Sequence, residues 1–315
     1  MDALWRQLAL PTPFLVWPDR GESSMTKAHP ASPAAATFPG AFATPEVRTH
    51  DETGDRYHVP ALARGLDLLT RFSRHQPRIT GAELAREMGL PRASVFRMLH
   101  TLERAGYIER VGDGAAYRLG LGVLRLGFEY LASMDLNDRG RAVIEKLRDV
   151  TGYSSHIVVR DGRDVVFVAK APGRSTLFQS VQVGARLPAH ATVLGRLLLS
   201  DLDEVALSEL YPERMLQRYT DRTPADVGEL SQLAAADRRR GWAMSEGGYE
   251  AGISAVAAPI LGADGRVMAV VSLTVPAERI DPAHAEVLGP QVHQAACEIG
   301  QRLADGNGSR DALRP

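Results

Sequence analysis

The chain has 315 residues but only one cysteine, Cys297, and no uncharged apolar run as long as a membrane helix. A single thiol excludes an internal disulfide and a zinc site built from cysteines, and it fits a reducing compartment. A membrane helix needs about 20 apolar residues. The N-terminal segment does not have the order of a secretory signal, because Asp2, Arg6 and Pro11 interrupt it. We therefore expect a cytoplasmic protein without a membrane partner.

Signatures of cofactor and metal chemistry are also missing from the sequence. No Gly-x-Gly-x-x-Gly follows an expected strand, and no phosphate loop ends in Gly-Lys-Ser or Gly-Lys-Thr. The histidines do not have metal-ligand spacing; those considered are His156, His284 and His293. We expect no cofactor, no metal site and no catalytic residue. His190 is interpreted as a hydrogen-bonded structural residue, and Cys297 as a small core residue of the last helix.

The average charge of the chain hides a local asymmetry. The whole chain has a formal net charge of −1. Between Pro60 and Arg118, however, there is no lysine, and ten arginines stand against six acidic residues, a net charge of +4. A basic segment on an otherwise acidic chain is attracted to polyanions. By itself, this segment fits solvated surface charge equally well.

The segment that follows Pro60 has the pattern of a helix-turn-helix. Leucines at helical spacing predict a helix over 60–74. Thr80, three residues before Glu83, forms a capping box that opens a short second helix. Gly89-Leu-Pro separates this helix from a third over 92–105, since glycine suits the end of one helix and proline the start of the next.

A hairpin follows the third helix. Residues 107–110 and 116–119 alternate between apolar and polar side chains on either side of Gly112-Asp-Gly, which is a turn signal. A helix, a helix-turn-helix and a hairpin in this order make a winged helix. The pattern therefore predicts a winged helix-turn-helix domain that binds double-stranded DNA.

The placement of polar residues in this domain predicts its contacts with DNA. In a helix-turn-helix, the second helix enters the major groove and its first residues reach the base edges. At that position the sequence has Arg92, Ser94 and Arg97, and arginine can bind guanine O6 and N7 through two hydrogen bonds. Other residues fall where contacts to phosphate set the register on DNA. These candidates are Arg78, Thr80, Arg110, Tyr117 and Arg118.

Composition and periodicity divide the whole chain into regions. The expected regions are a disordered N-terminal extension over 1–56, the winged helix-turn-helix over 57–120, a linker helix over 121–134, an effector-binding domain over 135–306 and a flexible tail over 307–315. Strands and helices in the C-terminal region follow no repeating βαβ period, which favours an α+β fold over a Rossmann sheet. Expected strands there are 155–160, 165–169, 178–183, 242–246, 254–260 and 267–275, and expected helices are 135–150, one from Ala191, 224–240 and 282–304.

Several runs, in this order, resemble the IclR family of regulators. In the basic segment they are Ala63-Arg-Gly-Leu-Asp-Leu-Leu, Leu90-Pro-Arg-Ala-Ser-Val-Phe-Arg-Met-Leu and Gly106-Tyr-Ile-Glu-Arg. Further on they are Val183-Gly-Ala-Arg-Leu-Pro-Ala-His-Ala-Thr-Val-Leu-Gly-Arg, Arg239-Arg-Gly-Trp and Ala257-Ala-Pro-Ile. The resemblance covers about residues 58–305. It implies a winged helix, a linker helix and a GAF-like α/β domain that holds a small organic acid. It also implies homodimers, or dimers of dimers, on palindromic operators.

The resemblance also implies an effector pocket. The loop Ala191-Thr192-Val193-Leu194-Gly195 enters a helix, so its backbone amides and the helix dipole would bind a carboxylate. Many family members have a cysteine and an aspartate where this chain has Ala255 and Ser245. Their loss leaves room for a larger, flatter effector than a two- or three-carbon keto acid, and we hypothesise an aromatic acid resembling hydroxybenzoate. The other candidates are Phe178, Leu187, Glu246, Ile253, Ser272 and Thr274.

Three functions remain open at this point. The first is a transcription factor whose affinity for its operator is tuned by the effector. The second is an enzyme acting on a small organic acid, with the winged helix used for assembly, although no nucleophile, base and orienting residue form a set. The third is a nucleoid-type DNA binder without a ligand, which the size of the second domain disfavours. Separately, the alternative to an aromatic effector is that Phe178 and Leu177 only fill the core.

Overall fold

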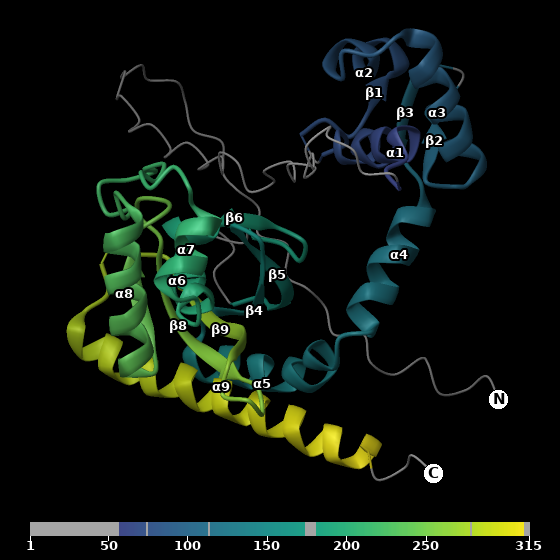
Figure 1. The fold of residues 1–315 in the computed structure, drawn as a ribbon. Coiled ribbons are helices and arrows are strands. Elements are labelled where there is room, and N and C mark those ends of the chain that lie inside the picture. Colours follow the sequence, from purple (N-terminus) through teal and green to yellow (C-terminus); the bar gives the residue numbers. More distant parts are fainter. Residues whose placement is uncertain (1–56, 74, 113, 174–180, 278, 312–315) are drawn as a thin grey trace, which may run out of the picture. The chain divides into compact units, whose positions relative to one another are not determined.

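The computed structural model describes residues 57–73, 75–112, 114–173, 181–277 and 279–311 (Figure 1). The expected N-terminal extension and Phe178 lie outside these residues. Among the helices that can be described, none has the length and apolarity of a membrane span.

The N-terminal domain is a winged helix-turn-helix with a small antiparallel sheet. Its elements are α1 (Pro60–Thr70), β1 (Ile79–Thr80), α2 (Gly81–Glu87), α3 (Arg92–Arg104), β2 (Ile108–Arg110) and β3 (Ala116–Leu119). The sheet has the order β1-β3-β2. Apolar side chains from all three helices and all three strands form one core, which contains Leu68, Phe72, Ile79, Leu84, Ala85, Val95, Leu99, Ile108 and Tyr117.

Local chemistry fixes the turn between α2 and α3. The Thr80 hydroxyl accepts a hydrogen bond from the Glu83 amide, and the Glu83 carboxylate accepts one from the Thr80 amide, so the predicted capping box is confirmed. Gly89, after α2, has a φ of +63°, a left-handed conformation that glycine adopts without a steric penalty. Pro91 then caps α3. These few residues therefore determine where α2 ends and α3 begins.

The C-terminal domain is an α/β domain around a six-stranded antiparallel sheet of order β6-β5-β4-β9-β8-β7. It is preceded by α4 (Leu121–Ala132), the expected linker helix. Its elements are α5 (Asp135–Thr151), β4 (Ser154–Asp161), β5 (Asp164–Ala171), β6 (Arg186–Pro188), the 3₁₀ turn η1 (Ala189–Ala191), α6 (Val193–Leu199), α7 (Glu204–Leu210), α8 (Val227–Arg240), β7 (Ala243–Glu246), β8 (Ser254–Leu261), β9 (Val267–Val275) and α9 (Pro282–Asp311).

Helices cover both faces of this sheet (Figure 1). Helices α5 and α9 pack on one face, where Ile144, Ile157 and Ile299 belong to one core. Helices α6 to α8 lie on the other face, where Leu197 and Leu230 belong to a second core. Successive side chains of a strand point to opposite faces of the sheet. A strand that is covered on both faces therefore has a continuous run of apolar residues in the sequence. This accounts for the absence of alternation in β8 and β9.

Some element boundaries differ from the expectations. The first helix ends at Thr70 instead of residue 74, because Ser73 and Gln76 exchange backbone hydrogen bonds in a turn. The described part of the expected strand 178–183 is not a strand, and the chain joins the sheet edge later, through β6. The last helix continues to Asp311.

The interpretation of Cys297 as a core residue is wrong. Cys297 is exposed on α9, whereas Ala296 and Ile299 are buried against the sheet. Each residue turns a helix by about 100°, so a thiol next to the buried stripe points away from it. The Cys297 Sγ atom lies 3.7 Å from Nε2 of His293, one turn earlier on the same helix.

Candidate DNA-binding surface and effector pocket

Helix α3 buries one side and exposes the other. Val95 and Leu99 lie in the core at a spacing of four residues, which places them on one side of the helix. Arg92 and Arg97 are exposed on the same helix, and Ser94 is half-buried. Helix α3 is the second helix of the helix-turn-helix, so the structure places these three candidates at the start of the recognition helix.

The wing arginines have internal partners. The guanidinium of Arg110 lies 3.3 Å from the Glu103 carboxylate and 5.2 Å from the centre of the Tyr117 ring. Arg118 forms an ion pair with Glu109 on the neighbouring strand. Both ion pairs are exposed and therefore weak. A phosphate contact by either arginine competes with an internal carboxylate.

Two other candidates have roles within the fold. Tyr117 is only 4% exposed and belongs to the domain core, on a strand that pairs with Ile79. A contact with phosphate needs a side chain on the surface, and the structure does not place Tyr117 there. Thr80 caps α2 through its hydroxyl. The remaining candidate, Arg78, is exposed just before β1.

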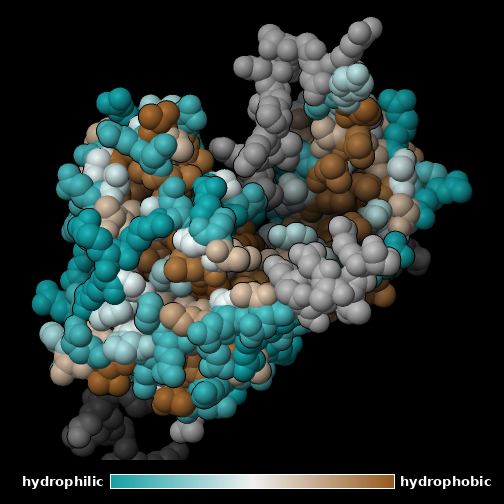
Figure 2. All heavy atoms as spheres, turned by 60° about the horizontal axis from the view of Figure 1, so that its bottom comes forward, coloured by the Kyte–Doolittle hydropathy of each residue, from teal (hydrophilic) through white to brown (hydrophobic). Residues whose placement is uncertain are grey.

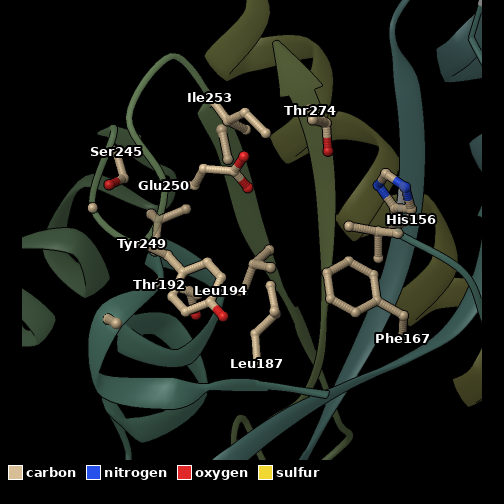
Figure 3. Close-up of a pocket in the computed structure, with 15 residues that line it drawn as sticks. His156, Phe167, Leu187, Thr192, Leu194, Ser245, Tyr249, Glu250, Ile253 and Thr274 are labelled. Atoms are coloured by element: carbon tan, nitrogen blue, oxygen red, sulfur yellow. The ribbon is translucent and has the colours of Figure 1, made fainter. Parts of the chain in front are cut away.

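A pocket of about 80 Å³ opens in the C-terminal domain between the sheet and the start of α6 (Figure 3). Eight of the predicted effector residues line it: Leu187, Thr192, Val193, Leu194, Ser245, Ile253, Ala255 and Thr274. Ala191, the first residue of the predicted effector loop, lines it as well. Six further residues line it that the sequence did not indicate: His156, Phe167, Val181, Gly248, Tyr249 and Glu250. The walls are therefore mostly apolar, with a few polar groups.

Strand register brings the polar residues of the pocket into rows. Ser245, Ala255 and Thr274 pair in one row across β7, β8 and β9. Ser272, two residues before Thr274 on β9, pairs with His156 on β4, and these two residues form a second row. Residues two apart on a strand share a face, so both rows face the same side of the sheet. Side chains that are far apart in sequence thereby meet at one surface.

The loop over 247–253, between β7 and β8, covers one side of the pocket. The Thr220 hydroxyl donates to the carbonyl of Gly247, and the Thr223 hydroxyl donates to that of Gly248. A side chain at Gly248 would collide with Ser245, so glycine allows the close approach of loop and strand. The ring of Tyr249 lies 4.9 Å from that of Tyr219. The two hydrogen bonds hold the backbone of the loop at the pocket, and the ring contact places Tyr249 beside Tyr219.

Burial shapes the charges in the pocket. Burial of the His156 ring, with the nearby Lys170 ammonium as a smaller cause, lowers its pKa to about 3, so the ring is neutral at physiological pH. Its edge contacts Phe167, with ring centres 5.3 Å apart. Burial also raises the pKa of the Glu250 carboxyl. Both groups are thus biased towards their uncharged forms.

Three predicted effector residues do not line the pocket. The Gly195 amide donates to the Thr192 hydroxyl within the helix cap, and a Cβ at this position would overlap the Ala189 carbonyl. The Glu246 carboxylate accepts from the amide of Ile280, away from the cavity. Ser272 is buried in the sheet row that contains His156, one row away from Thr274. Their roles are packing, capping and sheet structure.

His190 is hydrogen-bonded, as its interpretation requires. Its Nε2 lies 2.9 Å from the carbonyl oxygen of Gln217 and so donates to it. Burial lowers the pKa of the ring, against the raising effect of this bond. Rings of Tyr211 and Tyr219 pack against it. His190 therefore ties η1 to the loop that follows α7.

Comparison with known proteins explains why these two domains occur together. The family model described as the IclR helix-turn-helix domain matches residues 61–112. The model described as the bacterial transcriptional regulator IclR C-terminal domain matches residues 128–301, more than half of the chain. The chain belongs to the IclR family. It is a DNA-binding transcriptional regulator, and the resemblance seen in the sequence is confirmed.

Individual relatives support the same assignment. The Pca regulon regulatory protein of Pseudomonas putida is 32% identical over 82% of this chain and 88% of its own length. The p-hydroxybenzoate hydroxylase transcriptional activator of Acinetobacter baylyi is 32% identical over 76% of this chain and 87% of its own. An IclR transcriptional regulator from Alicyclobacillus acidocaldarius has a TM-score of 0.70 and 26% identity over 78% of this chain and 99% of that one. These relatives are regulators, so the expectation of a non-enzyme is confirmed.

The pocket residues that the sequence missed have a common reason. His156 and Phe167 lie on strands buried on both faces, so the sequence does not reveal which side chains point towards α6. Tyr249 and Glu250 lie in the loop between β7 and β8, where Gly247-Gly248 signals a turn but does not show what it faces. Only the folded chain shows that these residues converge.

Proposed function

We propose that this regulator binds an aromatic carboxylic acid in the pocket and that the bound acid alters its affinity for operator DNA. The observation that carries the proposal is a mostly apolar pocket with an aromatic wall in a chain that also has a DNA-binding domain. Phe167 and Tyr249 supply flat apolar surface, to which an aromatic ring is complementary. The names of two 32% identical relatives, the Pca and p-hydroxybenzoate hydroxylase regulators, support the same ligand class.

The carboxylate of the effector would lie at the start of α6. The first amides of a helix have no partner within the helix, and Val193 and Leu194, at that position, line the pocket. Hydroxyl groups of Thr192, Ser245 and Thr274 line it as well and can donate hydrogen bonds to carboxylate oxygens. The pocket thus offers hydrogen-bond donors for an anion.

The size of the pocket sets a condition on binding. A cavity of roughly 150 Å³ holds benzene, and this one encloses about 80 Å³. An aromatic acid therefore requires a side chain of the covering loop to move, with Tyr249 as the first candidate. Ser245 and Ala255 are small and keep their side of the pocket open.

On the DNA side, α3 enters the major groove. Arg97 and Arg92 contact base edges there, Ser94 contacts a base or a phosphate, and Arg78 contacts phosphate. The wing residues Arg110 and Arg118 exchange their internal carboxylates for phosphate oxygens. Exposed arginines at the start of a recognition helix support this arrangement.

A second copy of the chain would complete the regulator on a palindromic operator. Helix α4 buries none of its side chains in the single chain. Its exposed apolar residues are Leu121, Leu124, Leu126, Phe128 and Tyr130. Figure 2 shows several patches of apolar residues, in brown, among the hydrophilic ones on one face of the molecule. Exposed apolar surface of this kind is typical of a protein contact, which supports a homodimer or a dimer of dimers.

Calorimetric titration of the full-length protein with aromatic and aliphatic acids tests the proposal. The panel contains benzoate, 4-hydroxybenzoate, pyruvate and glyoxylate. We expect binding of at least one aromatic acid, and a change in operator affinity when that acid is present. Tight binding of pyruvate or glyoxylate with no heat from either aromatic acid contradicts the aromatic ligand. Binding of an aromatic acid without any effect on operator affinity contradicts the regulatory role.

A further inference from the structure

Two buried polar groups of the pocket lack hydrogen-bond partners. His156 is 2% exposed, and its Nδ1 atom has no partner among the described residues. Glu250 lines the same pocket, and its Oε2 atom is buried and also has no hydrogen-bond partner among the described residues. Buried polar atoms are nearly always hydrogen-bonded, because leaving one unpaired costs free energy. Two such atoms at one cavity point to a ligand that satisfies them.

The two groups lie on different elements and border the same space. His156 is on β4, and Glu250 is in the loop over 247–253. Figure 3 shows the Glu250 carboxyl and the His156 ring on opposite sides of the cavity, with the Thr274 hydroxyl between them. In that view, Thr192 and Leu194 lie below this row. The pocket therefore has a second polar region besides the start of α6.

We propose that Glu250 and His156 together bind a hydroxyl group of the effector, which makes the effector a hydroxy-substituted aromatic acid. This inference rests on the proposed function. A hydroxyl group both donates and accepts hydrogen bonds. Where Nδ1 of His156 carries the ring proton, it donates to the hydroxyl oxygen, and the hydroxyl group donates to Oε2 of Glu250. Where Glu250 is protonated and Nδ1 is not, Glu250 donates to the hydroxyl oxygen and the hydroxyl group donates to Nδ1.

The charge state of the pocket favours a hydroxyl group over other substituents. Burial keeps the His156 ring neutral, so it cannot serve as a cation for a second carboxylate. The burial that raises the pKa of the Glu250 carboxyl would also disfavour the charged form of a second carboxylate beside it. A methyl group would leave both buried atoms unpaired. A hydroxyl group avoids all three penalties.

A matched pair of ligands tests this assignment in the full-length protein. Benzoate and 4-hydroxybenzoate differ only by the hydroxyl group. We expect calorimetry to show about a 10-fold or greater preference of the wild type for 4-hydroxybenzoate. Glu250→Leu and His156→Phe keep much of the volume but remove the hydrogen bonds, so each should lower the preference about 10-fold. Glu250→Gln, which keeps a hydrogen-bonding side chain, should retain most of it.

The possible outcomes separate this inference from the function on which it rests. If both ligands bind and the preference is unchanged in Glu250→Leu and in His156→Phe, the two residues do not bind the hydroxyl group, while the aromatic ligand stands. If the wild type binds benzoate and 4-hydroxybenzoate equally well, the two residues likewise do not bind the hydroxyl group, while the aromatic ligand stands. If the wild type binds neither ligand, both proposals are wrong. Thermal unfolding verifies that each variant is folded, and Glu250→Met replaces Glu250→Leu if that variant does not fold.

Discussion

The two domains place their recognition groups in opposite environments. On α3, Arg92 and Arg97 are exposed to water, where charge is screened and costs the fold little. In the pocket, His156 is buried and Glu250 is half-buried, and burial shifts the pKa of each group towards its uncharged form. Changes on the DNA surface should therefore alter binding with little effect on stability. Changes in and around the pocket should alter binding and stability together.

The largest effect should come from crowding the start of α6. In Gly195→Ala, the new Cβ overlaps the Ala189 carbonyl, which forces α6 away from η1. We expect a loss of about 3 kcal/mol in the free energy of unfolding, measured by chemical denaturation. The matched control is Gly127→Ala on α4, where a Cβ meets nothing within 4 Å. It should stabilise the protein by about 0.5–1 kcal/mol. Equal stability of the two variants would contradict the described packing of α6.

On the DNA surface, the expected change is in binding alone. Arg97→Ala should weaken specific operator binding by about 1–3 kcal/mol, measured by fluorescence anisotropy, and leave effector affinity and unfolding unchanged. Arg266→Ala removes an exposed arginine of the C-terminal domain and serves as the control. If Arg97→Ala binds the operator as tightly as the wild type, the assignment of the recognition contact is wrong.

The buried imidazole should make stability depend on pH. The pKa of His156 is about 3 in the folded chain and about 6.5 in an unfolded one. As the pH falls from 7 to 5, the unfolded state therefore binds a proton that the folded state does not. Acidification over this range should cost the wild type about 2 kcal/mol more than His156→Phe. Denaturation curves at the two pH values measure this difference, and identical losses would show that His156 is not buried and neutral.

The smallest effect concerns the cap of α2. Thr80→Ala removes the hydroxyl that accepts from the Glu83 amide and should cost about 1 kcal/mol of stability. Thr80→Ser retains a capping hydroxyl and should cost less. If Thr80→Ala instead lowers operator affinity and leaves stability unchanged, Thr80 is a DNA contact and its role in the cap is minor.

Sequence and structure agree best where the determinants are local. The capping box of Thr80 and Glu83 lies within one turn of helix, and the turn at Gly89 within three residues, so both could be predicted. The start of α6 and the short side chains of Ser245 and Ala255 were indicated by family resemblance. These features depend little on the rest of the chain.

What the sequence could not predict depends on strand register and helix direction. His156 lies one row from Thr274, on the same face of the sheet, only because β4 pairs with β9. Tyr117 lies between Ala116 and Arg118 in a wing strand, yet its ring belongs to the core. The exposure of Cys297 depends on which side of α9 faces the sheet. Each outcome is set by contacts between segments that are distant in the sequence.

If the pocket and the DNA surface are coupled, the effector and the operator must change each other's affinity reciprocally. An operator fragment, selected with the purified protein, is titrated by fluorescence anisotropy with and without 4-hydroxybenzoate. The affinity of the acid is then measured by calorimetry for the free protein and for the operator complex. Our account predicts that the two affinities change by the same factor, because linkage is reciprocal. If the acid binds and neither affinity changes, the pocket does not regulate DNA binding.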